Sequence, residues 1–202
     1  MLMEKNNRLY LVRHGQVVDF DHSPVYGHTD IDITEVGKIQ MEHLTERLRL
    51  SNIKAVFSSD LQRAVKGARI IGRYHNVPHY SLPELREMYF GDWEGMRFKD
   101  IREQYPDELD RRKDDLVNFQ PPGDGESIAL FAERVMAAFQ NILDNQNGNE
   151  ILLVAHGGVN RVILCNSLGL DLSRLFYLQQ DYGCLNIIDY FPDSIVVKLV
   201  NG

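Results

Sequence analysis

The stretch Leu9-Tyr10-Leu11-Val12-Arg13-His14-Gly15 decides the fold of this chain. Its apolar run is short and unbroken, and it ends abruptly in a cation, an imidazole and a glycine. Such a run predicts a strand that is buried on both faces of a sheet. Ile151-Leu152-Leu153-Val154-Ala155 repeats the pattern and leads into His156-Gly157-Gly158. Because ligands bind outside the carboxyl ends of strands in open parallel sheets, the two His-Gly sequences predict two imidazoles at one site.

The composition is that of an ordinary globular protein. The chain has 202 residues, of which 44% are hydrophobic and 25% charged, enough for one sizeable core and consistent with a single domain. The formal net charge of −7 argues against nucleic acid or an anionic membrane as a partner, because both require a basic surface. A small phosphorylated metabolite remains open as a partner, since a few well-placed arginines decide that contact locally.

Targeting and cysteine signals point to the cytoplasm. No apolar run has the length of a signal peptide or of a bilayer span. The two cysteines, Cys165 and Cys184, are not in a metal-ligand spacing. We therefore expect reduced thiols, no structural metal and a cytoplasmic protein.

Apolar runs alternate with helical stripes along the chain, which predicts a three-layer α/β/α sandwich with a mostly parallel central sheet. Further strands are expected at 55–57, 79–82, 185–189 and 195–200. Helices are expected at 34–50, 60–74, 98–105, 107–119, from 127 and at 159–168. We expect Thr34 to cap its helix, Ser58 and Ser59 to precede the 60–74 helix as caps, and residues 111–115 to form a solvated mixed-charge face.

Arg63 stands out within the predicted 60–74 helix. It lies off the apolar stripe and in the first turn, where a cation opposes the helix dipole by a few tenths of a kcal/mol to about 1 kcal/mol. A cation at an unfavourable helix end indicates a role other than helix stability.

Two histidines and two arginines could support several chemistries. Metal binding lacks a third ligand at a suitable spacing near His14 or His156. Serine hydrolase chemistry lacks a Gly-x-Ser-x-Gly elbow. Phosphoryl transfer fits better, because a neutral imidazole is a nucleophile towards phosphorus and guanidinium groups match phosphate oxygens.

Glu87 is the candidate acid for protonating the leaving oxygen. Its neighbours Leu85, Met88, Tyr89 and Phe90 are apolar or aromatic, and such surroundings favour a protonated carboxyl. A structural ion pair with a cation such as Arg86 is the alternative, and the residues alone leave both interpretations open.

Four segments resemble the histidine phosphatase superfamily, the phosphoglycerate-mutase-like group. They are Leu11–Gly15, Ser58–Ala64, Leu85–Gly95 and Val154–Val159, which follow the order of the family and span nearly the whole chain. The resemblance implies one histidine phosphatase domain over residues 1–202, with a mostly helical insertion at about 96–126. It also implies that no metal or organic cofactor takes part.

The resemblance also assigns roles to individual residues. His14 is implied as the phosphorylated nucleophile and His156 as the second histidine, which stabilises the transferring phosphoryl group. Glu87 is implied as proton donor and then as base for water. The residues implied to bind phosphate or substrate are Arg13, Arg63, His156, Gly157, Gln16 and Gly27, the last within a segment (26–30) similar to one at the pocket mouth.

Within the superfamily, segments 85–95 and 180–185 are most similar to the α-ribazole-5′-phosphate phosphatases. The expected activity is hydrolysis of a small phosphomonoester, with α-ribazole 5′-phosphate as the first candidate substrate. The alternatives are a phosphoglycerate mutase, a broad-specificity phosphatase and a catalytically silent module that binds phosphorylated ligands. The oligomeric state stays open, a homodimer being one option.

The chain departs from the family pattern at three places. Gln16 stands where many members have an acidic residue, Asp19-Phe20-Asp21 where many have an asparagine, and Gly67 where a threonine is common. The second departure removes a phosphate-facing amide and places acidic residues beside the pocket mouth, which predicts an altered substrate preference; the effect of Gln16 stays open. The remaining histidines are expected to be non-catalytic; they are His22, His28, His43, His75 and His79.

Overall fold

A six-stranded sheet forms the centre of the computed structural model, which describes residues 6–18 and 24–202. The strand order is β3-β2-β4-β1-β5-β6. The strands are β1 (Asn7–Arg13), β2 (Ile53–Ser58), β3 (His79–Ser81), β4 (Glu150–Ala155), β5 (Leu185–Phe191) and β6 (Ser194–Leu199). Asp19-Phe20-Asp21 and His22 lie outside the described residues.

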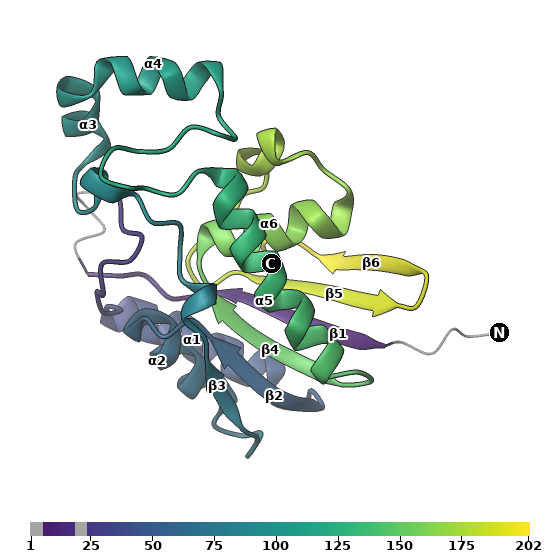
Figure 1. Cartoon of the computed structure of the whole chain (residues 1–202). Coiled ribbons are helices and arrows are strands. Elements are labelled where there is room, and N and C mark those ends of the chain that lie inside the picture. The colour runs from purple at the N-terminus through teal and green to yellow at the C-terminus, as the bar shows by residue number, and fades with distance from the viewer. Residues whose placement is uncertain (1–5, 19–23) are drawn as a thin grey trace.

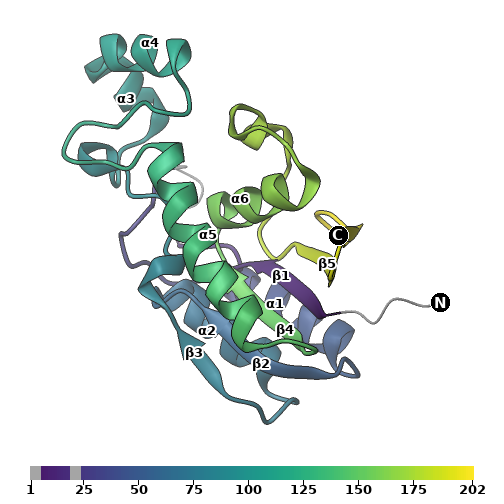
Figure 2. The same cartoon turned by 45° about the vertical axis from the view of Figure 1, so that its right-hand side comes forward.

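Helices cover both faces of the sheet, so the predicted three-layer architecture is confirmed (Figures 1 and 2). The α-helices are α1 (Glu35–Leu48), α2 (Gln62–Gly72), α3 (Phe98–Gln104), α4 (Pro106–Asp114), α5 (Ile128–Asn145) and α6 (Gly157–Leu168). The 3-10 helices η2 (Pro83–Leu85) and η3 (Gly91–Trp93) lie between α2 and α3, and η4 (Leu172–Tyr177) follows α6. Within the described ranges, no helix is long and apolar enough to cross a bilayer.

The sheet is mostly parallel, as predicted. Strands β3, β2, β4 and β1 all pair in parallel, whereas β5 runs antiparallel to both β1 and β6. In the β1–β4 register, Val12 lies opposite Val154 and Arg13 opposite Ala155. The His14 N–H continues the ladder by donating to the Ala155 carbonyl at 3.0 Å. Both His-Gly sequences therefore follow their strands side by side at one edge of the sheet.

The unbroken apolar runs are explained by two cores. Successive side chains of a strand point to opposite faces, so Leu9 and Leu11 pack with α5 and α6, while Tyr10 and Val12 pack with α1 and α2. Gly67 allows α2 to approach β4, because a Cβ there would lie 3.0 Å from Met41 Sδ and 3.2 Å from Val154 Cγ1. The departure at this position thus has a packing reason.

The predicted cap at Thr34 is confirmed, and Ser127 caps α5 without having been predicted to do so. The Thr34 and Ser127 hydroxyls accept from Gly37 N–H at 3.0 Å and Leu130 N–H at 3.2 Å. The expectation that Ser58 and Ser59 cap the next helix is wrong, because α2 begins at Gln62 with Leu61 as a cap that makes no side-chain bond. Both serine side chains are buried and bond to histidines instead.

Helices α3 and α4 lie away from the sheet, beyond the amino-terminal end of α5 in Figure 1. A small core of Trp93, Ile101, Leu109 and Phe119 supports them. Pro106 does not merely separate two helices: it occupies the first turn of α4, where its missing N–H costs no hydrogen bond. Helix α4 ends at Asp114 rather than near residue 119. Phe119 turns inward and stacks on Trp93, with the ring centroids 5.6 Å apart.

Candidate active site

A cavity of about 240 Å³ lies at the carboxyl ends of β1 and β4. It combines both histidines with two arginines and the candidate acid. The lining residues are Arg13, His14, Val17, Pro24, Val25, Tyr26, Ile31, Arg63, Glu87, Phe90, His156 and Tyr182. Five residues that the sequence singles out for catalysis thus share one cavity, although they come from four separate segments.

The two imidazoles form the floor of this cavity. Their ring centroids lie 5.2 Å apart with the planes at 63°. His14 is 5% exposed and His156 is 0% exposed. Two neighbouring strands in parallel register produce this proximity, because each histidine is the first residue after its strand.

The tautomer of His14 follows from the hydrogen bond at its Nδ1. Its Nδ1 lies 2.8 Å from the Gly15 carbonyl oxygen, which can only accept, so Nδ1 carries the proton. The lone pair is then on Nε2. This assignment leaves Nε2 chemically suited to attack an electrophile.

Both histidines are held in the neutral form. Burial lowers the pKa of His14 well below its usual value, and the charges of Arg13 and Arg63 lower it further. Burial, Arg63 and His14 act in the same direction on the pKa of His156. A neutral imidazole is the form that has a lone pair to donate.

His156 has a hydrogen-bond partner at each ring nitrogen. Arg63 Nε donates to its Nδ1 at 3.3 Å, and Nε2 lies 2.7 Å from the Ser59 hydroxyl. Since a guanidinium cannot accept, Nδ1 is the acceptor and the ring proton sits on Nε2, facing Ser59. Ser59 therefore fixes the orientation of the second histidine.

Arg63 is buried, at 1% exposure, and organises the wall opposite the strands. Its Nη1 and Nη2 donate to the carbonyls of Thr29 and Gly27, each at 2.6 Å. Burial lowers its pKa, while nearby carboxylates, Glu87 first among them, raise it. Each terminal nitrogen keeps a second N–H beyond these contacts, so the fork can still bind an anion.

Arg13 reaches the cavity from the end of β1. Its Nη1 donates to the Gln180 carbonyl at 2.6 Å, and its guanidinium lies 3.8 Å from the centre of the Tyr182 ring. Its Nε is buried and has no hydrogen-bond partner among the described residues. A buried donor without a partner is costly, and a phosphate oxygen would satisfy it.

Glu87 lies on the loop after η2, and its carboxyl contacts α6. Oε2 accepts from the Gly158 N–H at 2.9 Å, and Oε1 accepts from the Met88 N–H at 2.9 Å. The alternative ion pair with Arg86 is not formed, because Arg86 Nε donates to Asp60 at 2.7 Å instead. Among the residues that the structure describes, no cationic side chain forms an ion pair with the Glu87 carboxyl.

The other predicted binding residues differ in how closely they approach the cavity. Gly157 begins α6, and a Cβ on it would lie 3.1 Å from Arg161 Nη1 and 3.5 Å from Arg13 Nε. Gln16 does not line the cavity, and its side-chain oxygen accepts from Thr34 at 2.8 Å. Gly27 contributes its carbonyl to Arg63 rather than a cavity wall.

A second cavity of about 110 Å³ adjoins the first, with Glu87 and Phe90 lining both. Its wall is mainly apolar and aromatic, with two guanidinium groups. The remaining lining residues are Met88, Trp93, Arg112, Leu116, Phe119, Pro121, Ile128, Phe131, Gly158, Arg161, Leu175 and Phe176. Arg112 was expected on a solvated face, but burial lowers its pKa and its guanidinium lies 5.5 Å from the Phe176 ring.

The sequence interpretation missed several residues that line these cavities or hold the residues that do. They are Ser59, Glu94, Arg112, Arg161 and Tyr182. Glu94 joins the loop at Gly27 to the loop of Glu87, since its carboxylate accepts from the N–H groups of Gly27, Thr29 and Phe90. Arg161 carries the signal that revealed Arg63, a cation early in a helix, but Ser59 and Tyr182 carry no such signal. Over residues 6–18 and 24–202, no group of three His, Cys, Asp or Glu could hold a metal ion.

Comparison with known proteins agrees with this geometry. Residues 9–202 match the histidine phosphatase superfamily (branch 1). The chain is 30% identical to the adenosylcobalamin/alpha-ribazole phosphatase of Salmonella typhimurium over 195 residues, 96% of each chain. It is 29% identical to phosphoserine phosphatase 1 of Hydrogenobacter thermophilus over 182 residues, 89% of this chain and 82% of that protein.

A solved structure gives the same result. The alpha-ribazole phosphatase of Shigella flexneri superposes with a TM-score of 0.88 at 27% identity, covering 96% of both chains. The two cavities described above thus occur on a fold that the relative shares over almost its whole length. The chain belongs to the histidine phosphatase superfamily, branch 1, and is a phosphoric monoester hydrolase.

Proposed function

We propose that the enzyme hydrolyses its ester through a phosphohistidine on His14. The observation that carries the proposal is the neutral, buried His14–His156 pair, 5.2 Å apart, in one cavity with Arg13, Arg63 and Glu87. The Nε2 lone pair forms an N–P bond as the ester P–O bond breaks, and Glu87 gives its proton to the leaving oxygen. The alcohol departs, and Glu87 is left as a carboxylate.

The second half of the reaction reverses the role of Glu87. The carboxylate takes a proton from water as the water oxygen attacks phosphorus and the N–P bond breaks. Orthophosphate leaves, and both His14 and Glu87 return to their starting forms. Arg13 and Arg63 balance the charge on the equatorial oxygens throughout.

His156 and Gly157 complete the binding of the phosphoryl group in this proposal. A bound dianion favours the imidazolium form of His156; Arg63 Nε then turns from Nδ1 to the phosphoryl group, and the Nδ1–H donates to a phosphoryl oxygen. Gly157 opens α6, a helix of 12 residues whose amino-terminal N–H groups favour an anion. This arrangement needs no metal ion, since arginines and helix N–H groups supply the positive charge.

We propose that the leaving group occupies the second cavity, and that α-ribazole 5′-phosphate is the first substrate to test. Two observations support it: the names of the relatives from Salmonella and Shigella, and the apolar, aromatic wall beyond Glu87. The base of α-ribazole is a benzimidazole ring, which is planar and apolar. The guanidinium groups of Arg112 and Arg161 can stack on such a ring. Residues 96–126, as an insertion in one domain over 1–202, would form the outer wall of this cavity.

A turnover screen tests the proposal. We expect release of orthophosphate from α-ribazole 5′-phosphate with a kcat/KM at least about tenfold above that for phosphoserine or 3-phosphoglycerate, because one well-filled apolar pocket contributes roughly that factor. Preference for phosphoserine would keep the phosphatase and reject the substrate. Isomerisation of a phosphoglycerate without free phosphate would indicate a mutase, and tight binding without turnover a silent module.

Trapping of the intermediate tests the chemistry separately. Rapid denaturation in alkali during turnover of a ³²P-labelled ester should yield a phosphoprotein that loses its label in acid, as a phosphoramidate does. Label that is stable in acid would contradict histidine as the nucleophile.

A further inference from the structure

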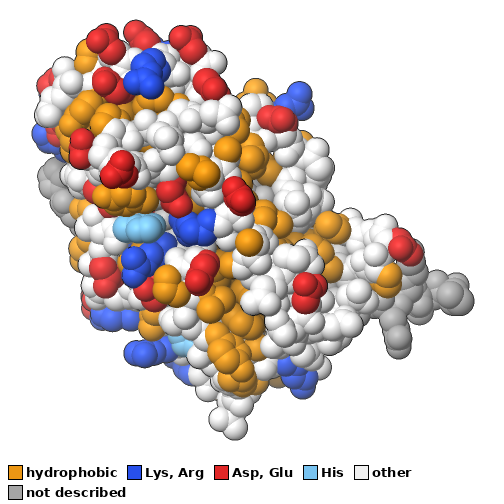
Figure 3. All heavy atoms as spheres, viewed as in Figure 1, with side chains coloured by type: hydrophobic (Ala, Val, Ile, Leu, Met, Phe, Trp, Pro, Cys, Tyr) orange, Lys and Arg blue, Asp and Glu red, His pale blue; other side chains and the backbone are white. Residues whose placement is uncertain are grey.

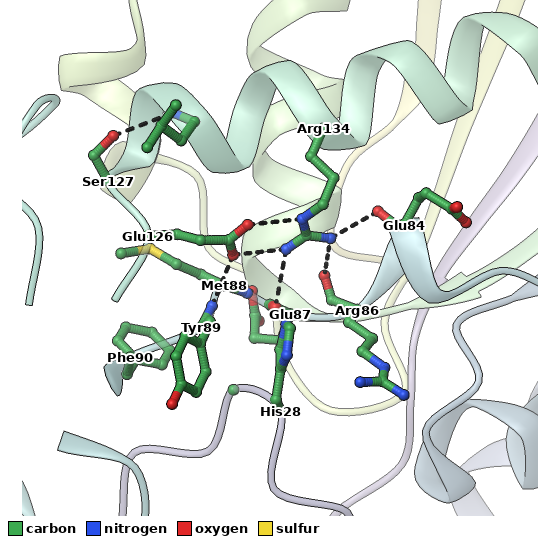
Figure 4. Close-up of polar contacts among 12 residues, drawn as sticks. His28, Glu84, Arg86, Glu87, Met88, Tyr89, Phe90, Glu126, Ser127 and Arg134 are labelled. Carbon is green, nitrogen blue, oxygen red and sulfur yellow. Dashed lines mark hydrogen bonds and ion pairs between the residues drawn. The ribbon is translucent and has the colours of Figure 1, made fainter. Parts of the chain in front are cut away.

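A partly buried ion pair lies beside the loop that carries Glu87 (Figure 4). Arg134 of α5 donates to both oxygens of Glu126, from Nε to Oε1 and from Nη2 to Oε2, each at 2.7 Å. The two side chains are only 23% and 19% exposed. Neither residue lines the phosphate cavity or the adjoining apolar cavity.

The same pair holds the backbone on both sides of Glu87. Arg134 Nη1 donates to the carbonyls of Glu84 at 2.8 Å and Arg86 at 3.2 Å, and Nη2 donates to the carbonyl of Glu87 at 3.3 Å. On the other side, the Tyr89 N–H donates to Glu126 Oε2 at 2.8 Å, and the Glu126 N–H donates to the Tyr89 carbonyl at 2.8 Å. Figure 4 shows these contacts converging on the loop from one side.

The loop has no regular secondary structure near the acid. Helix η2 ends at Leu85, and residues 86–90 belong to no helix or strand. On the face shown in Figure 3, charged side chains of both signs and a histidine gather near the centre, below the α3–α4 region. The orientation of the Glu87 carboxyl towards Gly158 therefore depends on side chains that hold the loop backbone, since no regular ladder does so.

We propose that Arg134, paired with Glu126, is a positioning residue that holds the Glu87 carboxyl where it can protonate the leaving oxygen. The inference rests on the proposed role of Glu87 as the general acid. Arg134 acts through the loop backbone, because it reaches neither cavity.

The electrostatics are those of a pair that stays charged. Burial disfavours the carboxylate of Glu126, but the Arg134 guanidinium and the Tyr89 N–H outweigh burial and hold the pKa of Glu126 below its ordinary value. A bidentate arginine–carboxylate pair also fixes geometry better than a single contact. A lysine could not reproduce it, since an ammonium lacks the planar fork.

The leaving group provides a readout that a merely structural role would not change. p-Nitrophenolate departs without a proton, whereas an alkoxide from an alkyl ester requires the acid. We expect Arg134→Gln to lower kcat/KM for an alkyl phosphate by about 10-fold to 100-fold, less than the roughly 10²-fold to 10⁴-fold of general acid catalysis, because the acid is displaced and not removed. For p-nitrophenyl phosphate, the same variant should change kcat/KM by less than about threefold. The parameter kcat/KM is chosen because it excludes hydrolysis of the phosphoenzyme.

Arg8→Gln is the matched control. Arg8 also forms a bidentate pair, with Asp189 at 2.6 and 2.7 Å, on β1 at the end remote from the active site. Arg8→Gln should leave unchanged the ratio of kcat/KM for the alkyl phosphate to kcat/KM for p-nitrophenyl phosphate. Glu126→Gln provides a second variant should Arg134→Gln unfold, and it should shift the ratio in the same direction. Arg134→Lys should fall between the wild type and Arg134→Gln.

Glu87→Gln separates the two hypotheses. If it impairs both esters equally, the proposed role of Glu87 as general acid is wrong and the inference fails with it. Glu87→Gln supports the acid role if it lowers kcat/KM for the alkyl ester selectively. In that case, a folded Arg134→Gln or Glu126→Gln variant that lowers kcat/KM for both esters equally, or for neither, overturns only the positioning role.

Discussion

The cavity of His14 and His156 (the proposed phosphate cavity) and the adjoining apolar cavity (the proposed leaving-group cavity) meet at Glu87 but are built in different ways. His14 and His156 follow two paired central strands and are almost fully buried. The leaving-group cavity is formed largely by loops, 3-10 helices and the 96–126 segment, and Phe176 in its wall is 53% exposed. The proposed phosphate cavity therefore derives its geometry from the sheet ladder, whereas the proposed leaving-group cavity depends on side-chain packing.

This difference separates chemistry from selectivity. A sheet register admits no small adjustment, because a shift of one residue turns every side chain to the other face. Loops tolerate changes in length and sequence far better. We therefore expect substitutions in the proposed phosphate cavity to lower activity towards every ester. Substitutions in the proposed leaving-group cavity should change the preference among esters.

The largest effect is expected for His14→Ala. It removes the nucleophile from a buried position, so hydrolysis of p-nitrophenyl phosphate should fall by a factor of about 10⁴ or more. Steady-state kinetics with circular dichroism checks both activity and folding. His43→Ala, an exposed histidine on α1, is the control and should keep full activity. A folded His14→Ala variant with a tenth of the wild-type rate would reject the phosphohistidine route.

Arg63→Gln should have the next largest effect. Loss of one charged donor at the developing phosphoryl charge typically lowers kcat by about 10² to 10³. The carbonyls of Gly27 and Thr29 also lose their donors, which should destabilise the fold by about 1–3 kcal/mol for each unsatisfied group. Arg69→Gln, exposed on the same helix, should change neither kcat nor the free energy of unfolding. Equal losses in the two variants would contradict a role in phosphate binding.

Phe176→Ala tests the leaving-group side. It removes part of the apolar wall and the ring beside Arg112 and Arg161, so kcat/KM for an aromatic ester should fall by about tenfold, equivalent to about 1.4 kcal/mol. Activity towards methyl phosphate, which leaves the cavity empty, should not change. Tyr177→Ala, a neighbour that is 81% exposed, is the matched control. A uniform loss towards both esters would show that the cavity does not select the leaving group.

The smallest effect concerns stability against pH. The pKa of His156 is lowered in the folded protein, so below its ordinary value of about 6.5 only the unfolded chain takes up the proton. The unfolded state then binds more protons, and the free energy of unfolding falls as the pH decreases from 6.5, by at most about 1.4 kcal/mol per pH unit for this group. Urea unfolding between pH 7.5 and 5 should give a shallower dependence for His156→Gln. Identical slopes would indicate that His156 is not held neutral.

The interior of the second cavity was predicted least well. Residues 111–115 carry charges of both signs, which usually indicates a solvated helix face, yet Arg112 lies against Phe176. The reason is that η4, far away in sequence, packs opposite α4 and offers an aromatic surface. Ser59 was misassigned for a similar reason: its hydroxyl has a partner on another strand's end, and a cap was only the local alternative.

The sequence alone determined the mostly parallel sheet and the meeting of His14 and His156 at one of its edges, because apolar runs that end in His-Gly report both burial and the edge at which a ligand binds. Only the tertiary structure decided the partners of those residues: which nitrogen of His14 carries the lone pair, that Arg63 binds the Gly27 and Thr29 carbonyls, and that Arg134 supports the loop of Glu87. The physical reason is that periodicity records which face of an element is buried. Hydrogen bonds between distant segments depend on register and on loop paths, which leave no periodic trace in the chain.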